Sequence, residues 1–142
     1  MSVTVTYSNH FRYMLSTKEI DFENDSFVIV LLNSEFAFDK DSHATLSDIT
    51  ASQLATNYGY TQDTKALSSV SVTEDDTDDA SIVTWADVEW IADGGTIGPS
   101  AAACIVDTTT GDDTVVLCIE FGEAASALDG YHFKITDIEL HI

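Results

Sequence analysis

The segment Phe27-Val28-Ile29-Val30-Leu31-Leu32 decides the fold class of this 142-residue chain. Its six residues are all apolar, three of them are β-branched, and Asn24-Asp25-Ser26 supplies a turn directly before it. A strand without a polar face is typical of a position where both faces of a sheet are covered. We therefore expect Phe27–Leu32 to be a central, buried strand.

Two more apolar runs, Ala101–Val106 and Val115–Phe121, flank a polar loop and predict a β-hairpin. If the hairpin is symmetric about Gly111, Cys104 and Cys118 face each other across the strands, since each lies seven residues from that glycine. Two cysteines match no metal-binding spacing and are too few for a disulfide scaffold. We expect two buried thiols in a sheet core, or a disulfide where exposure is oxidising and the geometry suits it.

Alternation of apolar and polar residues predicts strands along most of the remaining chain. It runs through Val3–Tyr7, Leu67–Val72 and Ile82–Trp90. It returns in Tyr131–Ile142, where the phase shifts by one residue at Thr136-Asp137 and predicts a bulge or bend.

One short helix is expected near the N-terminus, where Ser8 is a suitable cap and the apolar spacing ends near Thr17. From about residue 33 to 62 the pattern weakens, which indicates a long irregular excursion with local turns. We therefore predict a mainly all-β single domain over residues 1–142, an antiparallel β-sandwich or jelly-roll-like fold with one short N-terminal helix.

The charge balance excludes several partners. The chain has 25 Asp and Glu against 5 Lys and Arg, for a net charge of −20, and its basic residues are scattered singly. No basic patch is present to neutralise phosphates, so nucleic acid and anionic membranes are disfavoured as partners. The longest apolar runs are about a third of a bilayer-spanning helix. We expect a soluble, folded, acidic protein.

Motifs for catalysis are not found in the sequence. It contains no nucleophile elbow, no phosphate-binding glycine loop, no zinc-protease motif and no Cys-x-x-Cys pair. The histidines are far apart and each is expected at the surface: His10, His43, His132 and His141. The sequence therefore predicts neither an enzyme nor a cofactor.

Two acidic clusters offer oxygen ligands of the kind that Ca²⁺ accepts, Glu74–Asp79 and Asp107 with Asp112-Asp113. The candidate ligands are Asp75, Asp76, Asp78 and Asp79. Neither cluster matches the EF-hand loop, since Asp76-Thr77-Asp78 is followed by Asp79 and Ala80 with no glycine for the sharp turn. Solvated turns are the alternative interpretation.

Several short motifs follow one another along the chain: Glu19-Ile20-Asp21-Phe22, Asp25–Leu32, Asn57-Tyr58-Gly59-Tyr60-Thr61, Lys65-Ala66-Leu67, Val72–Asp76 and Ala86-Asp87-Val88-Glu89-Trp90. In order and spacing they resemble small structural proteins of tailed-bacteriophage virions, over about residues 3–142. The resemblance implies a capsid decoration (cement) protein that binds and stabilises the head lattice without catalysis. A structural protein of the phage tail or of a head vertex is the alternative within that group.

The resemblance also implies a place and partners. The protein would be made in the host cytoplasm and located in the virion, bound to the major capsid protein or another virion protein, as a homo-oligomer and by implication a trimer. The strand with Val3, Val5 and Tyr7 would add to the edge of a partner sheet. Apolar anchors would come from the excursion, unless they form a small core beneath it: Phe36, Phe38, Tyr58 and Tyr60.

Two other classes stay open. An acidic inhibitor that mimics DNA would array its carboxylates continuously, whereas here they gather in turns such as Glu74–Asp79. A small adhesion or ligand-binding β module is the second. Trp85 and Trp90 invite a sugar-stacking interpretation, but their odd spacing in one alternating strand places them on opposite faces.

Added NaCl should raise the melting temperature of the protein. Its net charge of −20 sits in turns exposed to water, where salt screens repulsion beyond about 10 Å at 0.1 M. Thermal melts followed by circular dichroism from low to molar NaCl check this. A melting temperature that stays flat over that range would contradict it.

Overall fold

The computed structural model describes residues 3–142; Met1 and Ser2, which the single-domain prediction includes, lie outside the described residues. The described chain is mainly β, as predicted. Its elements in order are β1 (Thr4–Tyr7), α1 (Asn9–Ser16), β2 (Phe27–Asn33), α2 (Leu46–Ile49), a 3₁₀ turn (Thr50–Ser52), β3 (Ser71–Asp75), β4 (Ala80–Thr84), β5 (Val88–Ile91), β6 (Ile97–Asp107), β7 (Thr114–Ala127), β8 (His132–Ile135) and β9 (Glu139–His141).

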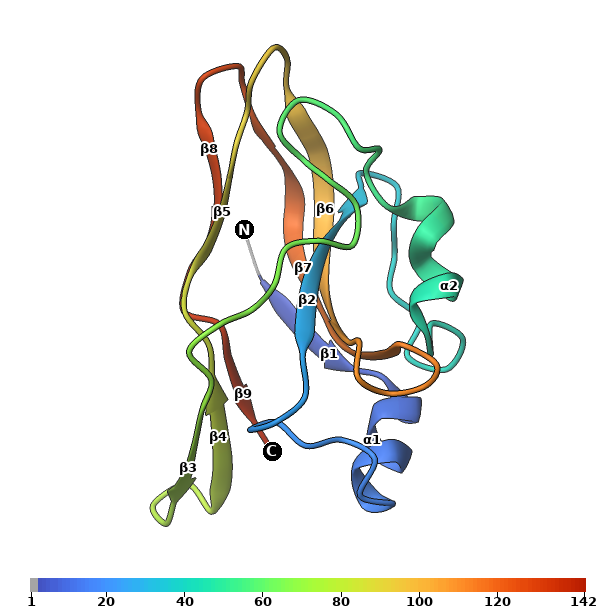
Figure 1. Ribbon diagram of the computed structural model, residues 1–142, viewed down its shortest axis with the longest axis vertical. Helices are drawn as coiled ribbons and strands as arrows, with labels where there is room; N and C mark the ends of the chain where they lie inside the picture. Colours follow the sequence, from blue (N-terminus) through green and yellow to red (C-terminus); the bar gives the residue numbers. More distant parts are fainter. Residues whose placement is uncertain (1–2) are drawn as a thin grey trace.

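The strands form antiparallel sheets arranged in layers. A four-stranded sheet in the order β1-β7-β6-β2 stands in the middle of the molecule. The sheets β3-β4-β9 and β5-β8 cover one of its faces, and α2 covers the other (Figure 1). The antiparallel sandwich-like fold is therefore confirmed, with a helical layer added outside it.

The second helix, α2, was not expected. It begins after Thr45, where the Asp48 carboxylate accepts the N–H groups of Ala44 and Thr45 at 3.0 and 2.9 Å. These bonds satisfy backbone donors at the start of a helix. A helix of four residues shows no apolar periodicity, so the sequence pattern does not reveal it.

Both faces of β2 are buried, as its sequence predicts. Phe27, Ile29 and Leu31 face the core between the sheets, whereas Val28, Val30 and Leu32 face the core under α2. The expectation of a central position is wrong, however, because β2 is the last strand of its sheet.

The irregular excursion closes the outer edge of β2, which explains how an edge strand can be buried. The N–H of Ile29 donates to the carbonyl of Lys65, and the N–H of Leu54 donates to the carbonyl of Leu31, both at 2.9 Å. The Tyr60 hydroxyl accepts the N–H of Leu31 at 2.9 Å. Isolated loop contacts thus satisfy backbone groups that a neighbouring strand would otherwise bind.

From Ala102 to Ile105, the β6–β7 hairpin has the register that symmetry about Gly111 predicts, and the register shifts on either side of this stretch. Cys104 lies directly opposite Cys118, and both side chains are completely buried and free. These two strands are the longest in the protein as described, at 11 and 14 residues.

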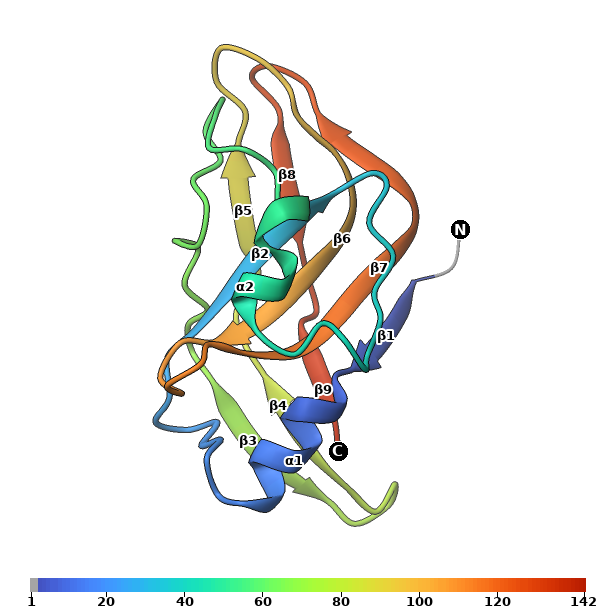
Figure 2. The ribbon, with the colours of Figure 1, turned by 90° about the vertical axis from the view of Figure 1, so that its right-hand side faces the viewer.

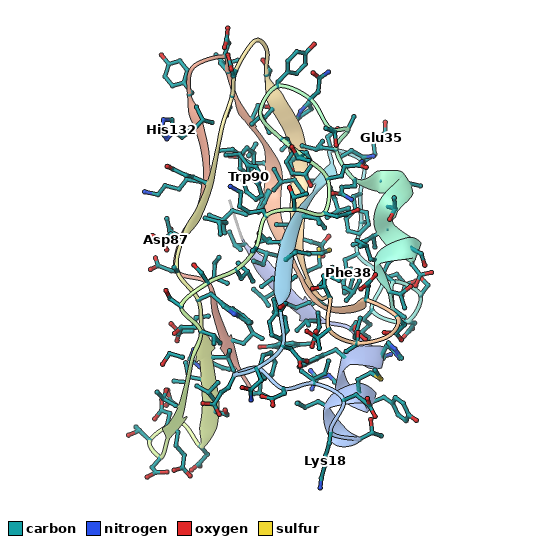
Figure 3. The ribbon with its side chains drawn as sticks, viewed as in Figure 1. Lys18, Glu35, Phe38, Asp87, Trp90 and His132 are labelled. Atoms are coloured by element: carbon teal, nitrogen blue, oxygen red, sulfur yellow. The ribbon has the colours of Figure 1, made fainter. Side chains whose placement is uncertain are left out.

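The phase shift at Thr136-Asp137 marks a change of sheet. β8 pairs with β5, whereas β9 pairs with β4, and Asp137 between them has a φ of 55°. The strand expected over Ile82–Trp90 also changes sheet along its length, and it is therefore two strands, β4 paired with β9 and β5 paired with β8. Trp85 and Trp90 are consequently both buried in the core between the sheets, and Figure 3 shows Trp90 pointing inward.

Replacing Tyr60 with Phe should lower the free energy of unfolding by about 1–3 kcal/mol, because it leaves buried polar groups without a partner. The Tyr60 hydroxyl donates to Gln53 Oε1 at 2.7 Å and accepts the N–H of Leu31. Tyr58→Phe is the matched control, since Tyr58 is exposed. Urea unfolding measures both variants, and equal stabilities would contradict the edge-closing role.

Candidate docking site

β1 is an edge strand whose second edge is open. It pairs with β7 alone among residues 3–142, and Figure 2 shows it at the border of the molecule. The N–H of Ser8 donates to the carbonyl of Val116 at 3.1 Å. Because hydrogen-bonded and non-hydrogen-bonded pairs alternate along an antiparallel ladder, this bond shows which residues of β1 bond to β7. Thr4 and Thr6 therefore turn their backbone groups toward β7, and Val5 turns its own outward.

The position of β1 is fixed by Ser8, which ends the strand and starts α1. Its buried hydroxyl donates to the carbonyl of Val115 and accepts the N–H of Phe11 at 2.9 Å. This is the helix cap that the sequence predicts. The cap holds β1 at a defined place on the border of the sheet.

An apolar groove of about 130 Å³ lies beside the open edge. Val5 lines it from β1 and Val3 from the position just before the strand, and they are 45% and 60% exposed. Ile135 lines it from the end of β8, Ile138 from the connection between β8 and β9, and Ile119 from β7. The groove opens where the central sheet and the outer sheets part, so an added strand could place side chains in it.

The charged residues that line this groove are acidic. They are Asp137 and Glu139, and the lining includes neither Lys nor Arg. The N–H of Asp137 donates to Asp87 Oδ1 at 3.0 Å, which secures the turn that carries the carboxylate. A partner segment with basic residues would complement this rim.

Tyr7 has a different role from the one expected of it. Its hydroxyl donates to the carbonyl of His141 at 3.1 Å and accepts the N–H of the same residue at 3.2 Å. The Arg12 guanidinium lies 5.2 Å from the centre of its ring. Burial raises the pKa of Tyr7 against the opposing effects of the His141 hydrogen bond and of Arg12. Tyr7 thus joins β1 to β9 within the chain, and its hydroxyl is already used.

The aromatic anchors expected in the excursion are mostly internal. Phe36 and Tyr60 are buried, so they do not face a partner. Phe36 and the half-buried Phe38 pack against the ring of His43, with centroids 5.1 and 5.6 Å away, and Figure 3 shows Phe38 on the α2 side of the sheet. Tyr58, 43% exposed, is the member of the set with an open face.

The acidic hairpin between β3 and β4 is a capped turn. Asp75 Oδ1 accepts the N–H groups of Thr77 and Asp78 at 3.0 and 3.2 Å, and Asp79 has a φ of 51°. Over the residues described, no group of three or more His, Cys, Asp or Glu side chains is placed to hold a metal ion. The geometry therefore adds nothing to the Ca²⁺ prediction for Asp75, Asp76, Asp78 and Asp79.

Three of the histidines each contact a carboxylate. His10 contacts Asp112 at 2.7 Å and His132 contacts Glu89 at 3.0 Å. His132 points outward from β8 (Figure 3), as expected. His141 contacts Glu139, its neighbour on β9.

The described chain contains no helix long and apolar enough to cross a bilayer. No family model, curated protein or solved structure matches the chain.

A buried carboxyl, Asp107, lies at the base of the β6–β7 hairpin beside the half-buried Asp25, a pairing that the sequence pattern did not predict. Asp107 is completely buried, and its Oδ1 accepts the N–H of Thr109 at 2.9 Å. Within residues 3–142, no donor reaches its Oδ2. Burial above all, and the neighbouring Asp25 carboxylate, raise the pKa of Asp107 to about 8.

The Asp107 carboxyl should make stability fall as pH rises. Its folded pKa of about 8 lies above its unfolded value near 4, so its contribution is complete below about pH 4 and is lost as pH rises through 8. Asp107→Asn keeps the acceptor for Thr109 and removes the charge that burial disfavours. This variant should be more stable than the parent by about 1–3 kcal/mol at pH 8.

Urea unfolding from pH 5 to 9 tests this expectation. Asp76→Asn, in the exposed β3–β4 turn, is the control for loss of one negative charge. Parallel pH profiles for the two variants would show that Asp107 holds no proton in the folded state.

Proposed function

We propose that the chain is a structural protein of a tailed-bacteriophage virion, and specifically a capsid decoration protein that binds and stabilises the head lattice without catalysis. The resemblance of its motif order to such proteins supports the class. The observation that carries the docking mode is the open edge of β1 beside an apolar groove with an acidic rim.

The docking mode we propose is addition of a partner strand to β1. An extended segment beside Val5 would gain main-chain hydrogen bonds, and every second side chain would reach the groove. Charge complementarity to Asp137 and Glu139 calls for Lys or Arg in that segment. The major capsid protein, or another virion protein, would supply it.

Both faces of β2 and of the adjoining part of β6 are covered, so these parts of the central sheet offer no free face and the docking surface we propose is the β1 edge. The outer sheets occupy one face, and α2 with the excursion occupies the other. A homo-oligomer, by resemblance a trimer, would repeat the β1 edge around a lattice axis. Attachment to the tail or to a head vertex is the alternative location within the virion.

Co-sedimentation with undecorated capsids tests the proposal, and Val5→Pro tests the edge. Proline removes the outward N–H of Val5 while the bonds of Thr4 and Thr6 to β7 remain. We expect the parent protein to sediment with capsids and this variant to bind about tenfold more weakly or worse, equivalent to about 1.4 kcal/mol.

Val72→Pro is the matched control, because Val72 is an exposed valine in β3, an edge strand of another sheet. Ser81 of β4 exchanges backbone hydrogen bonds with Ile142, so the odd-numbered residues of β4 turn their backbone groups toward β9. Val83 is one of these residues, and Val72 lies opposite it on β3. The N–H of Val72 therefore points outward, away from β4. Equal binding by the two proline variants would exclude β1 as the docking edge. Failure of the parent protein to bind heads would exclude the decoration role, and binding to tails would select the alternative.

A further inference from the structure

Cys104 and Cys118 form a directly opposed pair in the two longest strands of the described chain. β6 and β7 lie side by side in the central sheet (Figure 1), and neither cysteine side chain is accessible to solvent. Both belong to the core under α2. The segment 36–49, which contributes Phe36 and Ile49 to this core, is called the cover below. The structure holds both as free thiols.

The backbone register places this pair in the geometry that a disulfide requires. Ser8 bonds to Val116, and Thr6 lies opposite Cys118 two residues further along the same ladder. Cys118 therefore turns its backbone groups toward β1, and the Cys104–Cys118 pair is a non-hydrogen-bonded one. Facing residues in such pairs have Cα atoms about 4.5 Å apart, within the range that disulfides span.

We propose that Cys104 and Cys118 are a redox-modification site that a small-molecule disulfide, such as oxidised glutathione, converts into an internal cross-strand disulfide. The inference rests on the register and the shared core, and it does not depend on the proposed function. The bond would close a loop of 15 residues around the β6–β7 turn.

The chemistry is a thiol–disulfide exchange in two steps. One protein thiolate attacks the small disulfide, forms a mixed disulfide and releases one small thiol. The second protein thiolate then attacks the protein sulfur of the mixed disulfide, which forms the internal bond and releases the second small thiol. The protein loses two electrons and two protons, and the small disulfide gains them.

The cover over the pair controls the rate of this exchange. Burial, followed by the hydrogen bond and charge of Cys118, raises the pKa of the Cys104 thiol, so the closed protein offers little thiolate. The cover is held by the N–H of Leu46 on the carbonyl of Asp113 and by the N–H of Val115 on the carbonyl of Ala44, both at 2.9 Å. Local opening of this segment must precede oxidation.

Incubation of the full-length protein with oxidised glutathione tests the proposal. We expect the loss of both titratable thiols, a mass decrease of two hydrogen atoms, and a peptide that joins Cys104 to Cys118 in a non-reducing digest. The monomer should persist, and its melting temperature should rise by about 5–10 °C and return after reduction. Cys104→Ala should show no such rise.

Leu46→Ala should speed the oxidation about tenfold or more without changing its product, because Leu46 packs on the core that contains the cysteines. Leu15→Ala is the matched control, since Leu15 packs on the other core. Equal rates for the two variants would overturn the role of the cover. Thiols that stay free in the parent protein and in Leu46→Ala, or a bond that forms only between chains, would overturn the proposal.

Discussion

Burial of both faces of β2 is the constraint on which the remaining structure depends. A strand of six apolar residues needs a layer on each side, and its backbone groups need partners at both edges. The outer sheets supply one layer, and α2 with the excursion supplies the other. β6 satisfies one edge, and the excursion satisfies the other through Lys65, Leu54 and Tyr60. The long irregular segment is therefore an integral part of the core.

At the other edge of the same sheet, no segment of the described chain bonds to the outer side of β1. β1 has no second neighbour among the residues described, and the groove beside it is apolar. An edge of this kind invites pairing between copies of the same chain. The net charge of −20 opposes that encounter, and the acidic rim at Asp137 and Glu139 favours a basic segment instead. In the docking mode we propose, charge and backbone together call for a basic, extended partner segment.

Local patterns in the sequence predicted the local parts of this architecture. The register of Cys104 with Cys118 follows from two apolar runs about one turn, and the break at Thr136-Asp137 follows from a change of phase. The end position of β2 was missed because strand order depends on contacts between distant segments. The groove was missed for the same reason, since Val5 and Ile138 are far apart in the chain. The fate of an aromatic residue is equally non-local: Tyr60 is buried and Tyr58 is not, although one residue separates them.

The buried hydroxyl of Ser8 gives β1 a mechanical property. Ser8 joins the end of β1 to β7 through the carbonyl of Val115 and to α1 through the N–H of Phe11. The hydrogen bonds between β1 and β7 run across the strand direction, so tension along β1 loads them in shear and all at once. Any pull on a strand added to β1 would pass into β7 and on into the hairpin at the centre of the sheet. The border strand is thus attached in the orientation that best resists being drawn out lengthwise.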